Sequence, residues 1–296
     1  MDEHQGRDVG WLPASAAARV RELRALGVTE KRLRGPSVHH PFHGAVAPDP
    51  PDSLRAWCRA YLAVGASGAF FSGPTAAALH ELPLPRLPPG IHVSVPAPGR
   101  APRRPGIVGH SARVGAGDVI VLDDLPMSSL PRSWCELGCA VGVEDLVVAG
   151  DAALRRIDAA EPRQALEQAL TRAELRRGRP ALRYALALLD ARSESPQESR
   201  LRFRLVTAGI QGAEANLPIR TSHGRGYRGD LVFAERRVIL EYQGDHHRDP
   251  RTYRRDLERR LDLQADGWTV VELGPRDIAD PGLAGRVRAI LARRPR

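Results

Sequence analysis

The chain has 296 residues, of which 42% are hydrophobic and 27% charged, so it is long enough for two domains with packed cores. Lysine and arginine total 44 against 35 acidic residues, and the resulting charge of +9 attracts polyanions such as nucleic acid, although a GC-rich genome also enriches arginine whatever the function. No apolar run could span a membrane, no secretory signal is evident, and the three cysteines are too few for a disulfide framework, which predicts a cytoplasmic protein.

The N-terminal half is predicted to be an α+β region over 14–160, preceded by a disordered leader at 1–13. Its first helical pattern, 14–26, ends at Gly27, and a second short one follows at 28–34. Two short helices with basic residues around a glycine turn are typical of part of a helix-turn-helix, but the second is barely two turns long. DNA contact through this element therefore remains one alternative beside a structural role.

Helical and strand-like patterns alternate through the rest of this half. Helices are predicted over 53–66 and 134–156, and strands over 91–96, 108–114 and 118–129. This stretch has neither a glycine-rich phosphate loop nor a paired metal-ligand motif. Residues 161–192 form two alanine- and leucine-rich patterns, which predict a helical connector to a C-terminal α/β domain over 193–296.

The C-terminal domain opens with a helix that has clear start signals. Ser195 is placed to be the N-cap, Pro196 the first helical residue, and Glu198 the third, which completes a capping box. Glu198 therefore has a structural explanation. It also begins the stripe that continues through Leu201 and Leu205, and a carboxylate at the buried end of a helix is a natural ligand for a site on the adjacent sheet.

Two strand patterns follow, over 227–233 and 236–242, and their short link predicts a hairpin. In the expected register Asp230 lies opposite Glu241, with Cβ atoms about 4.5–5.5 Å apart. Two carboxylates this close repel each other, and a divalent cation between them would remove the conflict. Strand alternation places Gln243 on the same face as Glu241.

A helical pattern over 248–268 comes next, with a further strand after it. The apolar residues Tyr253, Leu257 and Leu261 are predicted to face the sheet. The opposite side carries four arginines, Arg254, Arg255, Arg259 and Arg260. These arginines are candidates to grip phosphates without reading sequence. The alternative is a solvated helix face whose charges pair with Asp256 and Glu258.

Taken together, these positions resemble the restriction-endonuclease-like superfamily of PD-(D/E)XK nucleases, and more closely the domain related to very-short-patch-repair (Vsr) endonucleases. The matching residues are Glu198, the run 229–233, the run 241–244, His246 or His247, Arg255, Asp256, Gly267 and Trp268. The resemblance covers about 195–296. It implies a mixed sheet flanked by helices, with Asp230, Glu241 and Glu198 as ligands of Mg²⁺ or Mn²⁺.

The preceding half more loosely resembles abortive-infection type IV antitoxin-like proteins. The similar segments are 39–48, 72–85, 103–110 and 145–156. This resemblance implies a regulatory or DNA-contacting role, and a partner protein in a toxin–antitoxin or defence system.

One position departs from the nuclease pattern. Many members carry a lysine two residues after the second acid, where this chain has Gln243, and Lys31 is its only lysine. The resemblance implies that His247 or His246 accepts the proton instead, since histidine titrates near neutral pH.

The sequence therefore predicts a metal-dependent DNA endonuclease of repair or of defence against foreign DNA. Its predicted catalytic residues are Glu198, Asp230, Glu241, Gln243 and His247, and its predicted nucleic-acid contacts include Arg254, Arg255 and Arg259. The alternative is an inactive nuclease fold that binds DNA or acts as an antitoxin-like regulator, which the missing lysine favours.

Overall fold

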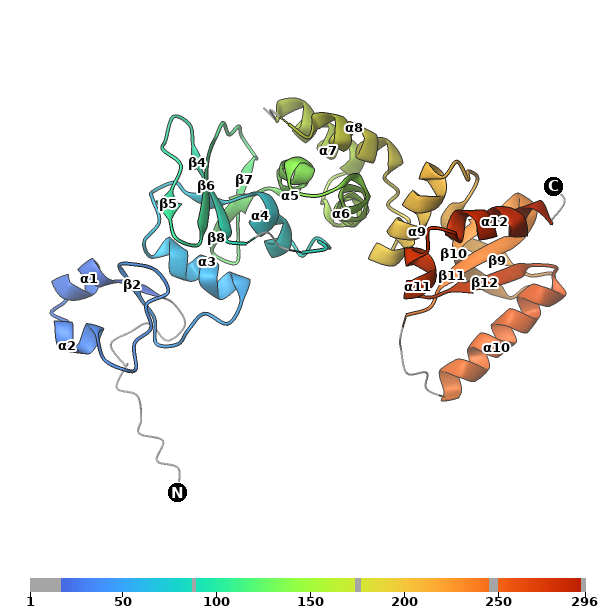
Figure 1. Ribbon diagram of the computed structural model, residues 1–296, viewed down its shortest axis with the longest axis horizontal. Helices are drawn as coiled ribbons and strands as arrows, with labels where there is room; N and C mark the ends of the chain where they lie inside the picture. Colours follow the sequence, from blue (N-terminus) through green and yellow to red (C-terminus); the bar gives the residue numbers. More distant parts are fainter. Residues whose placement is uncertain (1–16, 87–88, 174–176, 245–249, 294–296) are drawn as a thin grey trace, which may run out of the picture. The chain divides into compact units, whose positions relative to one another are not determined.

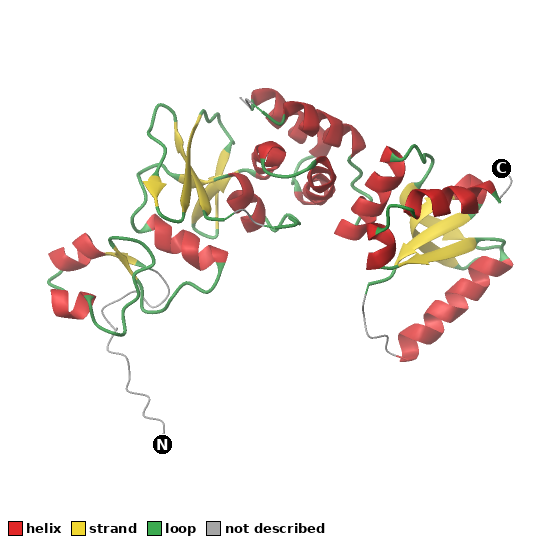
Figure 2. Ribbon diagram, in the orientation of Figure 1, coloured by secondary structure: helices red, strands yellow, loops and turns green. Residues whose placement is uncertain are grey.

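The computed structural model describes residues 17–86, 89–173, 177–244 and 250–293 (Figure 1). Helices and mixed sheets occur throughout, which confirms the predicted α/β class (Figure 2). The chain divides into two compact units, one formed by the residues up to Glu81 with Arg86–Ala140, the other by Leu82–Pro85 with Val141–Arg296. The boundary therefore lies ahead of the predicted connector.

The first unit contains a two-stranded sheet and a six-stranded mixed sheet of order β5-β6-β4-β3-β8-β7. Its strands are β1 (Ala18–Arg19), β2 (Ala45–Val46), β3 (Phe70–Phe71), β4 (Ile91–Pro96), β5 (Arg103–Arg104), β6 (Ile107–Ala112), β7 (Val119–Leu122) and β8 (Leu125–Ser128). Its helices are α1 (Val20–Ala25), α2 (Glu30–Leu33), α3 (Leu54–Leu62), α4 (Gly73–Leu79) and α5 (Leu130–Glu136), the last followed by a 3-10 turn at Leu137–Cys139. Tyr61, Phe71 and Met127 lie in its core. With four residues, α2 is too short to serve as a recognition helix in a major groove.

The second unit has one sheet of order β12-β11-β10-β9. Its strands are β9 (Glu214–Arg220), β10 (Gly226–Phe233), β11 (Val238–Tyr242) and β12 (Thr269–Leu273). β9, β10 and β11 pair antiparallel and β12 joins β11 in parallel, so the sheet is mixed, as predicted. The helices are α6 (Val143–Arg156), α7 (Pro162–Arg172), α8 (Arg179–Leu188), α9 (Pro196–Thr207), α10 (Pro250–Ala265), α11 (Pro275–Ala279) and α12 (Leu283–Ala292).

Both faces of this sheet are covered by helices. On one face, Leu201 and Leu205 of α9 pack with Leu231 and Leu240, together with residues of α11 and α12. On the other, Leu263 of α10 is fully buried against strand residues that include Ile239. The core thus holds the strands β10 and β11 between two helical layers.

The prediction for the inner face of α10 is wrong. Leu257 and Leu261 are 43% and 57% exposed, and the side chain of Tyr253 lies outside the described residues. The helix is instead held by the apolar Leu263 and by polar contacts, among them those of Asp262 with Arg225 and Tyr227. Arg225, in the turn before β10, and Tyr227, in β10, lie 37 and 35 residues away from Asp262 in the sequence, so the helical periodicity alone selected a different face.

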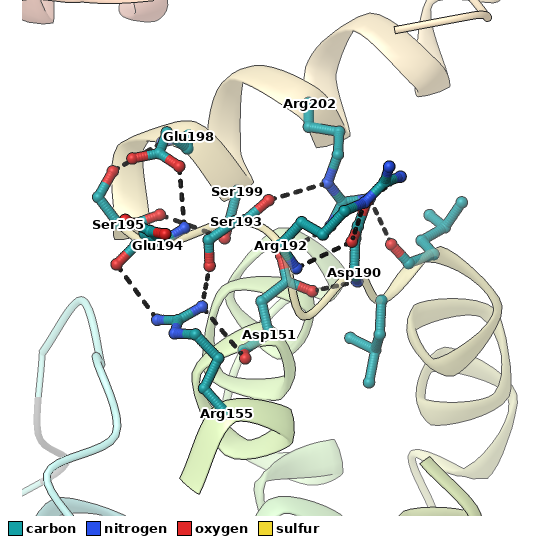
Figure 3. A network of polar contacts seen from close by, with 12 residues as sticks. Asp151, Arg155, Asp190, Arg192, Ser193, Glu194, Ser195, Glu198, Ser199 and Arg202 are labelled. Carbon is teal, nitrogen blue, oxygen red and sulfur yellow. Dashed lines mark hydrogen bonds and ion pairs between the residues drawn. The ribbon is translucent and has the colours of Figure 1, made fainter. Parts of the chain in front are cut away.

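The predicted connector is an integral part of the second unit, because α9 and α6 hold its C-terminal end: Arg202 of α9 donates to the carbonyl oxygen of Leu188 in α8, and the N–H of Asp190 donates to Asp151 of α6 at 2.7 Å. The Asp151 carboxylate of α6, fully buried, forms an ion pair of 2.7 Å with Arg202 of α9 (Figure 3). Arg200 of α9 also pairs with Glu144 and Asp145 at the start of α6. The helices of 161–192 therefore do not form a free linker.

Gly229 of β10 occupies a position where a side chain would not fit. A Cβ there would come within 2.7 Å of the Cγ2 methyls of Ile239 and Val232, which are both buried. Gly229→Ala is therefore expected to destabilise the fold by about 1–3 kcal/mol, as overpacked cores do. Urea unfolding followed by circular dichroism measures this change.

Gly226→Ala is the matched control, since a Cβ at this position of the same strand meets no described atom within 4 Å. Its expected effect is within about 0.5 kcal/mol. Equal losses for the two variants would contradict the close approach at Gly229.

Candidate functional site

The predicted N-cap of α9 is present, but the capping box is only half formed, because the Glu198 carboxylate binds the N–H of Glu194 in place of that of Ser195. Ser195 Oγ accepts a hydrogen bond from the N–H of Glu198 at 3.2 Å, and Pro196 begins the helix. The Glu198 carboxylate in turn accepts from the N–H of Glu194 at 2.8 Å, one residue before the N-cap (Figure 3). The cap thus aims this carboxylate back over the start of the helix.

Asn216 of β9 connects Glu198 to the sheet. Its backbone is in the left-handed region, with φ of 49°, a conformation that asparagine tolerates better than most residues. Its Nδ2 donates to Glu198 Oε2 at 2.6 Å and to the carbonyl oxygen of Arg192 at 2.6 Å. The sequence analysis did not identify Asn216 as a candidate. The feature that could have marked it is an asparagine inside a strand, where this residue is uncommon.

The register of the hairpin agrees with the prediction. Leu231 pairs with Leu240 and Phe233 with Val238, so Asp230 and Glu241 are the next residues beyond the last printed pair, and the N–H of Tyr242 donates to Asp230 Oδ2. A 3-10 turn at Ala234–Arg236 closes the hairpin. Alternation along two apolar strands was enough to place the two acids side by side.

Asp230, Glu198 and Glu241 form an acid cluster at one end of the sheet, and Asp230 is its central member. Its pKa is raised, first by burial and then by the negative charges of Glu198 and Glu241. A hydrogen bond of 2.8 Å from the N–H of Tyr242 and the charge of Arg259 oppose the shift only in part. Acids from α9, β10 and β11 therefore act on one another at this end of the sheet.

Glu241 is buried and already has a cationic partner. The Arg259 guanidinium donates to both carboxylate oxygens, with a distance of 2.8 Å to Oε2, and also to the carbonyl oxygen of Arg228 at 2.6 Å. Arg259 is thus drawn inward from α10. The sequence pattern pointed to Arg259 as a phosphate contact and missed this ion pair, because nothing local links α10 to β11.

The other predicted residues are placed as follows. Gln243 follows β11, and its N–H donates to the carbonyl oxygen of Leu273 at 2.9 Å, which extends the pairing with β12. His246, His247 and the side chain of Arg254 lie outside the described residues. Arg255 is exposed, whereas Arg260 forms an ion pair with Glu272.

Carboxylates are chemically suitable ligands for a divalent metal ion. The way these acids are arranged in this structure suits a metal ion less well. Carboxylate oxygens are the ligands that Mg²⁺ prefers, and a cation would relieve the repulsion at Asp230. Within the described parts of the chain, no group of three or more histidine, cysteine, aspartate or glutamate residues is arranged to hold a metal ion. Arg259 accounts for part of this, since it occupies both oxygens of Glu241.

The two acids should respond oppositely to neutralisation in the absence of metal. Asp230→Asn is expected to stabilise the protein at pH 7 by about 0.5 kcal/mol, because it removes repulsion between facing like charges. Glu241→Gln is expected to destabilise it, because it leaves Arg259 half-buried without its carboxylate. Urea unfolding in EDTA measures both.

The pH dependence gives the same test a second readout. Because the folded-state pKa of Asp230 is raised, the native protein binds this proton at a higher pH than the unfolded chain does. Stability should therefore increase as the pH falls from the raised pKa towards the ordinary aspartate value, and the contribution should vanish in Asp230→Asn. A parent and variant with parallel pH profiles would contradict the assignment.

Comparison with known proteins leaves the family open. No family model matches the chain. Two uncharacterized proteins of Mycobacterium tuberculosis, from strains H37Rv and CDC 1551, are each 35% identical to it over 146 residues. The match covers 48% of this chain and 53% of each relative, so the chain spans about half the length of the curated relatives it matches.

Among solved structures, the crystal structure of the RV2827C protein from Mycobacterium tuberculosis matches 69% of this chain and 83% of its own. The identity is 16% and the TM-score 0.38, a likeness too low to carry an argument. Among the described helices, none is both long and apolar enough to cross a membrane.

Proposed function

We propose that this protein is a metal-dependent DNA endonuclease that hydrolyses phosphodiester bonds with the acid cluster of its second unit. The observation that carries the proposal is the environment of Asp230, a half-buried carboxylate facing the charges of Glu198 and Glu241. A structural role does not favour such a group, and acids whose pKa is shifted by burial and by neighbouring charges are often found at functional sites.

The acids have distinct roles in this proposal. Asp230 and Glu241 would hold Mg²⁺ or Mn²⁺, with Glu198 as a further ligand, direct or through water. The bound metal would supply a more acidic water and positive charge at the phosphate. Gln243 would orient the attacking water, and His247 or its neighbour would accept the proton.

Arg259 has to leave Glu241 before that carboxylate can bind a metal. The phosphate backbone of DNA is the natural alternative partner for its guanidinium, since arginine pairs with phosphate in the same two-pronged way. Arg255, exposed on the same helix, would add a contact to the backbone. The phosphate role predicted for α10 thus stays part of the proposal.

A second candidate function rests on the same contact. If Arg259 permanently supplies the positive charge at Glu241, the fold needs no metal, and the protein is an inactive nuclease fold that binds DNA or regulates a partner in a toxin–antitoxin or defence system. The glutamine at position 243 also favours this alternative. A cytoplasmic location is part of both proposals.

A plasmid-cleavage assay with the full chain separates the two. The endonuclease should nick or linearise supercoiled plasmid with Mg²⁺ or Mn²⁺ and leave it intact with EDTA. Calorimetric titration of Mn²⁺ into the same protein should show binding. A chain that binds no metal and cleaves neither single- nor double-stranded DNA would establish the regulator instead.

A further inference from the structure

A strongly basic cleft lies within the first unit. Its volume is about 780 Å³, and its walls come from β1, α1, α2, the 40–44 segment, the end of α3 and β5. The described residues that line it include two histidines, one carboxylate, that of Glu30, and six arginines: Arg19, Arg21, Arg24, Arg34, Arg103 and Arg104. Positive charge therefore greatly exceeds negative charge in this cleft.

Two of the six arginines build the walls. Arg19 Nε donates to the carbonyl oxygen of Ala63 at 2.6 Å, and an Arg104 guanidinium nitrogen donates to that of His43 at 2.8 Å. These bonds join the two-stranded sheet to the end of α3, and β5 to the 40–44 segment. The cleft is thus a feature of the folded unit and does not depend on surface side chains alone.

The other four arginines, Arg21, Arg24, Arg34 and Arg103, have little or no negative charge beside them among the described residues. Arg24 and Arg34 share the single carboxylate of Glu30, and their side chains are 54% and 80% exposed. Arg21 and Arg103 are exposed, and in the part of the chain that the structure describes neither has a carboxylate partner. Like charges gathered without counter-charge repel one another, so folding alone does not explain them.

We propose that this cleft binds the phosphate backbone of duplex DNA, as a DNA contact separate from the acid cluster. Exposed guanidinium groups spread over the walls of an open cleft match the repeated charges of a backbone, and each can grip a phosphate through two N–H groups. With α2 only four residues long, the contact does not read base sequence. The choice of DNA as the polyanion rests on the proposed function.

The test is fluorescence anisotropy of a labelled 20-base-pair duplex with the full chain in EDTA, where no cleavage occurs. Arg21→Ala/Arg103→Ala should weaken binding about tenfold at low salt and lower the slope of log affinity against log salt by about two, near one for each phosphate that is no longer neutralised. The matched control is Arg86→Ala/Arg100→Ala, which removes the same charge from exposed residues of this unit outside the cleft. Circular dichroism melting confirms that both variants fold.

Three outcomes would overturn the proposal: binding by the cleft variant equal to that of the parent, equal loss in the control, or tighter binding of ATP than of the duplex at the cleft. The third would identify a nucleotide site. A parent that binds DNA through the cleft but never cleaves it would refute the endonuclease and leave this inference standing.

Discussion

Replacing Asp230 with asparagine is expected to lower DNA cleavage by about three orders of magnitude, since a catalytic metal contributes several kcal/mol to the transition state. The side chain keeps its shape and can still accept the hydrogen bond from the Tyr242 N–H, so the fold should survive. Calorimetry with Mn²⁺ should show lost or much weaker metal binding. Plasmid cleavage in parallel reactions measures the rate.

His247→Ala is the informative companion variant, because it separates proton transfer from metal binding. Loss of a general base should slow cleavage by about a hundredfold and leave Mn²⁺ affinity nearly unchanged. If the Asp230 and His247 variants both cleave like the parent, the activity belongs to another site or to a contaminant.

Replacing Arg202 with methionine is expected to cost about 3–5 kcal/mol of stability, because it leaves the Asp151 charge buried without its cation. Asp151 is fully buried and keeps only neutral donors, such as the N–H of Asp190 at 2.7 Å. Arg202 Nε also donates to Ser193 Oγ, so its loss should loosen the loop that precedes the Glu198 cap (Figure 3). Urea unfolding of the full chain measures the change.

The same helix offers a control for this experiment. Arg200 pairs with Glu144 and Asp145, but its side chain and theirs are partly exposed, so Arg200→Met should cost at most about 1 kcal/mol. The double variant Asp151→Leu/Arg202→Met should recover most of the loss, because a buried ion pair can often be replaced by apolar groups. Equal effects of Arg200→Met and Arg202→Met would show that burial of the pair is unimportant.

The features that the sequence determined by itself are local ones. Ser195, Pro196 and Glu198 lie within one turn, so the start of α9 could be predicted to the residue. The facing of Asp230 and Glu241 followed from period-two alternation across a short turn, where a slip by one residue would expose a whole apolar face. The α/β class followed from the same periodicities.

The tertiary structure alone decided which groups meet across long separations in the chain. Arg259 pairs with Glu241, and Asp151 with Arg202, through contacts that no spacing in the sequence announces. The inner face of α10 was decided in the same way, by Leu263 and by strand residues far away, against the apparent stripe of Leu257 and Leu261. A helix with charges on every side has several faces of similar apolar content, and only the complementary groups on the sheet select among them.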